Sequence, residues 1–462
     1  MIDTKVFDEL MNYGIITQVG LNPADYKDIA DLQRYGLATS IGAAQTYEEV
    51  TASLINKEEV LAKFLADVAA GGTVVVPMNL ELTAPITIEK DVTIDLNGYT
   101  ISNTPWLEDG ETNAYMFWVK AGKLTINGEG TVSVPDAIYS MAVWANGGDV
   151  EINGGTYING GDSCDLIYAS KKGNIVINNG TFKASGPASG TVPGTKNPYS
   201  ALNIKDSNKS TCSILVKGGK FYKFDPANNL SENPAMNFCA TGYSSVANGD
   251  WFKVIEGVRT EEELKKVVAE GGKVKLLNNI SLTDYIEVRK AVVVDLNGYN
   301  IVHPKTSTSK YPDVFEVMTG GSLVIEGNGD VVAENGYSVY AAGDAVVEIN
   351  GGNYFSPVTT VDARKNASVT INAGTFKVDG SNNPEGDFGQ KFTLNLRDKV
   401  GNYVGELSEI KVKGGKFYKY NPAASESEPE VISFVAAGYE SIADGDWYVV
   451  SEAKDIVVDD NE

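Results

Sequence analysis

The chain has 462 residues, of which 42% are hydrophobic, and a formal net charge of −23. This length allows two to four domains of about 100–200 residues each. The excess of acidic residues excludes the basic face that nucleic acid requires and disfavours anionic membrane surfaces, so we expect neither as a partner.

Residues 1–57 precede every repeat and predict a small helical segment. The stretches "DTKVFDELMNYG" and "NPADYKDIADLQRYG" each place apolar residues along one stripe and end at a glycine. The residues expected to form the binding face of this segment are Val6, Phe7, Leu10, Met11, Tyr13, Tyr26, Ile29, Leu32 and Tyr35. A segment of this size is marginal as a domain. It therefore either packs on the first repeat unit or binds another protein, including sister subunits.

The N-terminal stretch "MIDTKVFDELMNYG" carries acids where a signal peptide needs a basic region and an apolar run. No window approaches the roughly 18 continuous apolar residues of a membrane span. We therefore expect the chain to be made and folded in a cytoplasm, without membrane insertion.

Two further helices are expected at the start of each repeat unit. The stretch "NKEEVLAKFLADVAAGG" predicts a helix with its N-cap at Asn56. Its expected buried face consists of Val60, Leu61, Phe64, Leu65 and Val68. The matching stretch "TEEELKKVVAEGG" carries a capping box, Thr260 with Glu263, before a glycine stop. We expect both helices to cover open strand edges.

A long internal repeat divides the rest of the chain. The phrase "KGGKFYKFDPANN" at Lys217 returns as "KGGKFYKYNPAAS" at Lys413, and "DLNGY" occurs at both Asp95 and Asp295. Each unit ends in a predicted hairpin, with Asp444–Gly445 as the tight turn of the second. The sequence thus predicts four parts: a helical segment 1–57, repeat units at 58–257 and 258–451, and an acidic tail 452–462.

A shorter period lies inside each unit. Ile126, Ile152 and Ile177 recur at steps of 26 and 25 residues in similar phrases such as "VEINGGTYI" and "IVINNGTFK". Apolar residues alternate with polar ones, which is typical of short strands with one buried face. Such steps predict a mostly-β fold of two tandem right-handed parallel β-helices with helical caps. Asparagines at equivalent corners are expected to form amide ladders, namely Asn153 with Asn178 and Asn350 with Asn372.

Residues that would carry catalysis are scarce. The GHG and RIK phrases of polygalacturonases are missing. The only adjacent aspartates, Asp459 and Asp460, lie in the acidic tail. The sole histidine, His303, precedes a proline and is expected in a surface loop. A single histidine excludes a metal site built from three histidines. Three cysteines without a CxxC spacing predict neither a disulfide framework nor a zinc site. We expect no enzymatic activity, no metal and no cofactor.

Four aromatic residues fall outside the repeat pattern: Trp106, Tyr115, Trp118 and Trp144. Aromatic rings offer a flat apolar face, and those of Tyr and Trp also carry a hydrogen-bonding group. These residues are therefore candidates either for stacking on sugars or for filling a subunit interface.

The phrases "GGKFYKFDPANN" and "NFCATGYSSVANGDWFKV", the "DLNGY" turns and the helical leader together resemble β-helix virion proteins of tailed phages of gut bacteria. In particular, the chain is similar to head-fibre or capsid-decoration proteins of crAss-like phages. The resemblance covers the repeat units. It implies a virion location, a β-helix that projects from the particle, and attachment to the capsid or other virion proteins through residues 1–57. No catalytic residue is implied.

The leading hypothesis is thus a homo-oligomeric structural virion protein, a head fibre or capsid decoration, with glycans as a further candidate partner for adhesion to a host. The alternative is a secreted-type carbohydrate-binding or polysaccharide-degrading β-helix protein. Acidic polysaccharides are disfavoured as partners by the charge of −23. A bacterial adhesin would need an export or anchoring signal.

Overall fold

The computed structural model describes residues 47–108, 110–135, 137, 140–160, 165–184, 201–228, 235–309, 312–378, 392–396, 407–427 and 430–454. Strands account for 51% of the structure and helices for 8%, and most strands pair in parallel, which confirms the expected mostly-β class. The nine residues predicted as the binding face of the N-terminal segment, Val6 to Tyr35, lie outside the described residues.

The contacts divide the chain into two compact units, and the division falls within strands β20 (Tyr243–Asn248) and β21 (Trp251–Glu256). Unit 1 consists of the residues up to Phe238 together with Ala247–Lys253. Unit 2 consists of Cys239–Val246 and the residues from Val254 onward.

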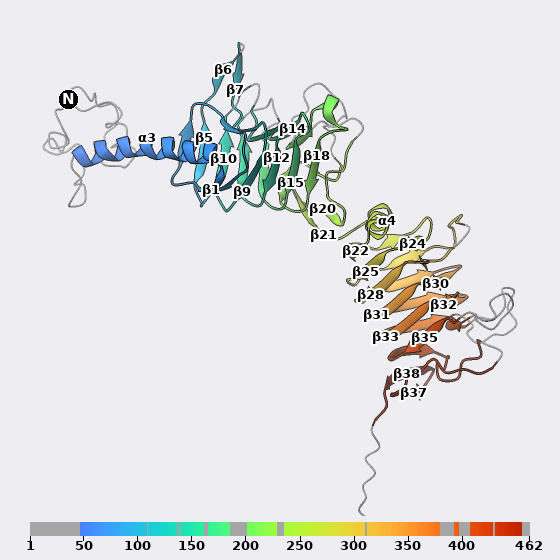
Figure 1. Ribbon diagram of the computed structural model, residues 1–462. Helices are drawn as coiled ribbons and strands as arrows, with labels where there is room; N and C mark the ends of the chain where they lie inside the picture. The colour runs from blue at the N-terminus through green and yellow to red at the C-terminus, as the bar shows by residue number, and fades with distance from the viewer. Residues whose placement is uncertain are drawn as a thin grey trace, which may run out of the picture. The chain divides into compact units, whose positions relative to one another are not determined.

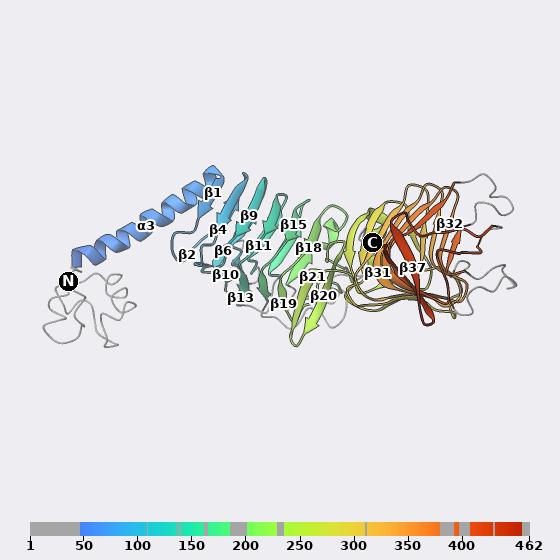
Figure 2. The same ribbon diagram turned by 90° about the horizontal axis from the view of Figure 1, so that it is seen from below.

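Unit 1 opens with helix α3 (Tyr47–Ala70), which meets strand β1 at its C-terminal end (Figure 2). The expected N-cap at Asn56 is wrong, because the helix runs through this position without a break. No glycine or proline interrupts the helix between Tyr47 and Ala70, so nothing in the backbone forces a stop. Phe64 and Val68 are buried as expected, but Leu65 is 36% exposed and does not belong to the buried face.

Three parallel sheets form the body of unit 1 (Figure 1), and the chain visits them in turn. The first sheet contains β1 (Gly72–Val75), β4 (Val92–Asp95), β9 (Lys123–Asn127), β12 (Asp149–Ile152), β15 (Asn174–Ile177) and β18 (Ser213–Val216). The second contains β2 (Leu80–Leu82), β5 (Thr100–Asn103), β10 (Thr131–Val134), β13 (Thr156–Asn159), β16 (Thr181–Lys183) and β19 (Lys220–Tyr222). The third contains β3 (Ile86–Ile88), β8 (Phe117–Val119), β11 (Val143–Asn146), β14 (Ile167–Ser170) and β17 (Leu202–Ile204). The 3-10 turn η2 (Asp206–Asn208) follows the third sheet.

One extra hairpin interrupts this order between β5 and β8. Strands β6 (Trp106–Glu108) and β7 (Glu111–Asn113) pair antiparallel with each other and project beyond the three sheets (Figure 1). This hairpin lies between Ile94 and Ile126, a longer step than the steps of 26 and 25 residues that follow it.

Unit 2 repeats the plan behind helix α4 (Glu261–Glu270), whose predicted capping box of Thr260 and Glu263 is confirmed. Its first two sheets merge because β31 (Val346–Ser356) and β33 (Ser368–Val378) run through both. The other strands of the merged sheet are β22 (Gly272–Lys275), β23 (Ile280–Ser281), β25 (Ala291–Asp295), β26 (Ile301–His303), β28 (Ser322–Glu326), β29 (Asp330–Ala333), β35 (Glu409–Val412), β36 (Gly415–Tyr418), β37 (Tyr439–Asp444) and β38 (Trp447–Glu452). The third sheet contains β24 (Ile286–Val288), β27 (Phe315–Val317), β30 (Tyr337–Ala342), β32 (Thr359–Arg364) and β34 (Leu394–Leu396).

Alternating burial explains why these short strands form. In β4, Val92 and Ile94 are buried while Thr93 lies between them on the outer side. Parallel pairing places similar residues of successive strands next to one another, so aromatic rings stack inside each unit. In unit 1, Phe182 stacks on Tyr157 at 5.0 Å and on Phe221 at 4.7 Å between ring centroids. The core is therefore a column of side chains continuous through each unit.

The predicted amide ladders are present at the outer corners. Asn178 donates to Asn153 at 2.6 Å, Asn153 donates to Asn127 at 2.8 Å, and Asn372 donates to Asn350 at 2.8 Å. The predicted hairpin at the end of unit 2 is also confirmed, with Asp444 opposite Trp447. These side-chain bonds satisfy polar groups at corners where the backbone turns.

His303 does not lie in a surface loop, as expected from the adjacent proline, but is fully buried at the end of β26. The alternation of this strand points Ile301 and His303 to the same inner side. There, the two ring nitrogens lie within hydrogen-bonding distance of the Asp313 carbonyl and the Ser307 hydroxyl. The segment that follows the strand folds back and covers the histidine. The described cysteines, Cys212 and Cys239, are both buried.

Candidate functional site

The third sheet of unit 1 carries a row of large side chains on its outer face. Phe117 and Val119 of β8 point into the core, so Trp118 between them points outward. Parallel register places Trp118 beside Trp144 of β11, and Trp144 beside Tyr168 of β14. Because neighbouring parallel strands lie about 4.8 Å apart, these rings must be in contact.

The four aromatic residues singled out in the sequence form one cluster. The rings of Trp118 and Trp144 stack with their centroids 5.6 Å apart and an interplanar angle of 15°. Tyr115 meets both indoles edge-on, at 5.5 Å and 5.3 Å, and Trp106 of the β6–β7 hairpin packs on Tyr115 at 4.9 Å. The structure thus brings together residues from three separate segments of the chain.

Tyr168 extends this cluster and was missed in the sequence. Its ring lies 6.4 Å from that of Trp144 and is tilted by 51°. The signal was available, because "IYAS" from Ile167 to Ser170 repeats the pattern of "VWAN" from Val143 to Asn146. Tyr168 therefore occupies the same strand position as Trp144, one step further along the sheet.

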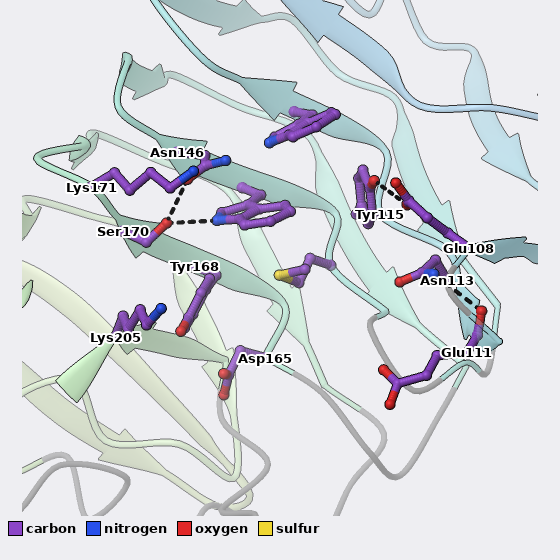
Figure 3. A pocket seen from close by; sticks show the side chains of 13 residues that line it. Glu108, Glu111, Asn113, Tyr115, Asn146, Asp165, Tyr168, Ser170, Lys171 and Lys205 are labelled. Atoms are coloured by element: carbon purple, nitrogen blue, oxygen red, sulfur yellow. Dashed lines mark hydrogen bonds between the residues drawn. The ribbon is translucent and has the colours of Figure 1, made fainter. Parts of the chain in front are cut away.

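A pocket of about 510 Å³ opens over this row of rings (Figure 3). It is lined by Glu108, Glu111, Asn113, Tyr115, Trp118, Met141, Trp144, Asn146, Asp165, Tyr168, Ser170, Lys171 and Lys205. In Figure 3, Lys171 and Lys205 lie on the same side as Asn146 and Tyr168, whereas Glu108 and Glu111 lie on the opposite side with Tyr115. The pocket thus has one side with Lys171, Lys205 and Asp165 and an opposite side with Glu108 and Glu111.

Hydrogen bonds hold the polar walls in place. Trp144 donates its indole Nε1–H to Ser170 Oγ at 2.9 Å, and Ser170 donates to Asn146 Oδ1 at 3.0 Å. On the opposite side, Tyr115 donates its hydroxyl to Glu108 at 2.9 Å. Burial, together with this bond to Glu108, raises the pKa of Tyr115, so the hydroxyl remains a donor at neutral pH. The pocket is therefore formed before any ligand arrives.

The indole N–H groups of Trp144 and Trp118 differ in their hydrogen bonding. The Nε1–H of Trp118 is buried and has no acceptor within the described part of the chain. One face of the Trp118 ring is covered by the Lys120 ammonium, 3.6 Å from the ring centroid. A cation over the indole face is attracted by the ring quadrupole. Trp118 is thus in contact with Lys120 as well as with Trp144.

The same strand positions in unit 2 carry different chemistry. In register along the third sheet, Glu316, Tyr340 and Asp362 stand where unit 1 has Trp118, Trp144 and Tyr168. Asp362 is fully buried and forms a two-point ion pair with Arg364, which also lies over the rings of Tyr337 and Tyr340. The row of aromatic rings formed by Trp118, Trp144 and Tyr168 thus belongs to unit 1.

Two carboxyl groups near this ion pair have unusual acidities. Burial raises the pKa of Glu316 to about 7, helped by repulsion from Asp313, Glu287 and Asp284. Burial likewise raises the pKa of Asp313 to about 6. Glu316 makes no side-chain hydrogen bond within the described residues. A carboxyl that is half protonated near neutral pH can give or take a proton, which makes it a titratable group of interest.

In the ranges that the structure describes, no group of three or more His, Cys, Asp or Glu side chains could hold a metal ion. The helices in those ranges include none long and apolar enough to traverse a bilayer.

Comparison with known proteins gives no relative for this arrangement. No protein-family model, no curated protein and no solved structure matches the chain.

Proposed function

We propose that the chain is a structural virion protein, a head fibre or capsid decoration, that adheres to glycans through the aromatic pocket of unit 1. Attachment to the particle would use residues 1–57, and the two units would be displayed outward. The resemblance of the repeat phrases supports the virion assignment. The pocket is the single observation that supports adhesion.

Each unit is proposed to be a right-handed parallel β-helix. The support is the strand order: successive strands enter three sheets in turn, and each sheet grows by one parallel neighbour at every step. Parallel crossovers in proteins are almost always right-handed. Such a rod has two ends to protect, and the helices α3 and α4 with the hairpin β37–β38 are suited to that role.

The pocket fits a sugar ring on three grounds. Its volume of about 510 Å³ lies within the range of small-molecule sites. The half-buried rings of Trp144 and Tyr168 line the pocket and offer apolar surface to the C–H groups of a pyranose. Carboxylates, amides and a hydroxyl around the rim, including Asp165, Asn146 and Ser170, can bond to sugar hydroxyls.

A glycan array probed with the full chain tests adhesion. We expect binding to a defined set of glycans, and we expect Trp144→Ala to reduce it at least tenfold. The control is Tyr340→Ala, the same strand position in unit 2, which should bind as the wild type does. Because Trp144 packs on Trp118, circular dichroism must show that the variant is folded, and Tyr168→Ala provides a second variant with fewer contacts. Absence of binding to every glycan would reject adhesion.

The virion assignment has its own test. Mass spectrometry of purified phage particles from the producing culture should detect the chain at structural-protein abundance. Its absence from the particles would reject the assignment, whatever the outcome on the array.

A second candidate function, cleavage of a polysaccharide, is favoured by the pair Asp313 and Glu316. Glycosidases combine a carboxyl group with raised pKa and a second carboxylate. A reducing-sugar assay on neutral polysaccharides tests this, with Glu316→Gln as the variant. Release of sugar ends that Glu316→Gln abolishes would favour this candidate, and no release by the wild type would reject it.

A further inference from the structure

We infer that the unit 1 pocket selects a sugar that carries a single anionic substituent, a carboxylate or a sulfate, held by Lys171 and Lys205. This inference rests on the proposed adhesion to glycans and specifies the class of glycan. It is based on the positions of the two lysines, their lack of ion-pair partners, and the charge on the opposite wall.

The two lysines approach the pocket from neighbouring strands. Lys171 follows the last residue of β14, and Lys205 follows the last residue of β17. These strands pair in parallel with Tyr168 opposite Asn203, and the Lys205 backbone N–H donates to the Ala169 carbonyl at 2.9 Å. Lys205 therefore lies next to Ser170, the residue that receives the Trp144 indole N–H. An anion bound between the two lysines would lie beside the rings of Trp144 and Tyr168.

The carboxylate on the lysine side of the pocket, Asp165, accepts a hydrogen bond from Asn203 Nδ2 at 2.8 Å. Lys171 and Lys205 form no ion pair within the described part of the chain, and both side chains are exposed. The nearest acidic neighbour in sequence, Asp206, is already paired with Lys209 at 2.9 Å. Both ammonium groups are therefore available to a ligand at the pocket. An anionic ligand would supply the missing charge.

The opposite wall sets the orientation and limits the number of charges. Glu108 and Glu111 lie across the pocket from the lysines in Figure 3. Carboxylates accept hydrogen bonds from sugar hydroxyls but repel a second anion. The anionic group would thus point toward Lys171 and Lys205, with hydroxyls toward Glu108 and Glu111.

The net charge of the whole chain points to the same conclusion. A strongly acidic protein repels polyanions, but salt at physiological strength screens exposed charges beyond about 8 Å. A single anionic group on the lysine side of the pocket would lie next to Lys171 and Lys205, whereas a polyanionic chain would also pass over the acidic surface. We therefore expect an anionic terminal sugar rather than an acidic polymer.

Calorimetric titration of the full chain with matched methyl glycosides tests the inference. Methyl glucuronide and methyl glucoside differ only in the carboxylate, and glucose 6-sulfate represents the sulfate class. We expect at least one of the two anionic probes to bind about tenfold more tightly than the glucoside, which corresponds to about 1.4 kcal/mol. The preference should shrink in 0.5 M salt. Polygalacturonate should bind no more tightly per site than the single sugar.

The variants separate charge recognition from ring stacking. The double variant Lys171→Gln and Lys205→Gln should lose the preference, so that it binds the anionic and the neutral sugar with equal affinity. Lys172→Gln removes the same charge one residue outside the pocket lining and should keep the preference. Trp144→Ala should weaken both probes together.

The outcomes are distinguishable. Equal binding of neutral and anionic sugars by the wild type would overturn this inference and leave adhesion standing. A preference that survives the double lysine variant would assign the anion to another site and also overturn it. Binding of no sugar by titration or on the array would reject the inference and the proposed adhesion together.

Discussion

At the scale of single residues, the outward position in the middle of each third-sheet strand decides what a unit can contact. The two units place their backbones alike, yet Trp118 and Trp144 in unit 1 correspond to Glu316 and Tyr340 in unit 2. Outward side chains do not fill the core, so they can vary without disturbing the strand. The chemistry of each unit is therefore determined by a few positions on one face.

The raised pKa of Glu316 predicts how the stability of unit 2 depends on pH. This pKa rises on folding from an ordinary value of 4.5 to about 7. A raised pKa contributes stability at pH values below the unfolded pKa, and this contribution is lost as pH rises through the folded pKa. The melting temperature of unit 2 should thus fall between about pH 5 and pH 8, and Glu316→Gln should reduce this dependence. At pH 8 we expect the variant to melt about 2–4 °C higher than the wild type.

Thermal melts followed by circular dichroism at several pH values provide the measurement. The control is Glu452→Gln, an exposed residue at the end of β38 in the same unit. The same slope for the wild type and Glu316→Gln would show that Glu316 is not the titrating group.

At the scale of elements, helix α4 covers the first strands of unit 2 and is held by its N-terminus. The Thr260 hydroxyl accepts a hydrogen bond from the Glu263 N–H at 3.2 Å. The Glu263 carboxylate accepts in return from the backbone of Arg259 and the Ser244 hydroxyl. Two residues of the helix, Leu264 and Val268, are buried. The cap therefore fixes both the start of the helix and its place on the sheet.

Removal of this cap should destabilise unit 2 without changing its fold. We expect Thr260→Ala to lower the free energy of unfolding by about 1 kcal/mol, the usual contribution of an N-cap side chain. Urea unfolding followed by far-UV circular dichroism provides the measurement. Thr306→Ala serves as the control because Thr306 is exposed. Equal midpoints for the two variants would contradict the role of the cap.

At the scale of the whole molecule, the chain combines two repeats with a leader of different character. The apolar stripes predicted for residues 1–57 can be buried on symmetry mates, which is a common route to a homo-oligomer. Because Phe64 and Val68 of α3 are buried, a truncation must leave this helix intact. The natural place to cut is before Tyr47.

We expect the full chain to be an oligomer and the chain without residues 1–46 to be a monomer of unchanged strand content. Light scattering coupled to size exclusion gives the mass, and circular dichroism gives the strand content. A full-length monomer would rule out self-association, and an oligomer that persists after truncation would move the interface to the repeat units.

The sequence by itself determined the features that depend on neighbouring residues. The step between Ile126, Ile152 and Ile177 determined the short parallel strands, since alternating burial needs only the local pattern. The capping box of Thr260 and the hairpin turn at Asp444 were predicted for the same reason. The amide ladders followed because equal corners stack once the period is known.

Only the tertiary structure decided the features that depend on residues distant in sequence. Asn56 is a good N-cap residue, yet α3 continues through it because no stop lies nearby. His303 is buried because the chain at Ser307 and Asp313 folds over it. The four aromatic residues were visible in the sequence, but their meeting with Tyr168 and Lys205 in one pocket depends on strand register and on the β6–β7 hairpin. Side chains about 25 residues apart become neighbours only when each strand lies beside the previous one, and the local pattern does not specify which loops then enclose them.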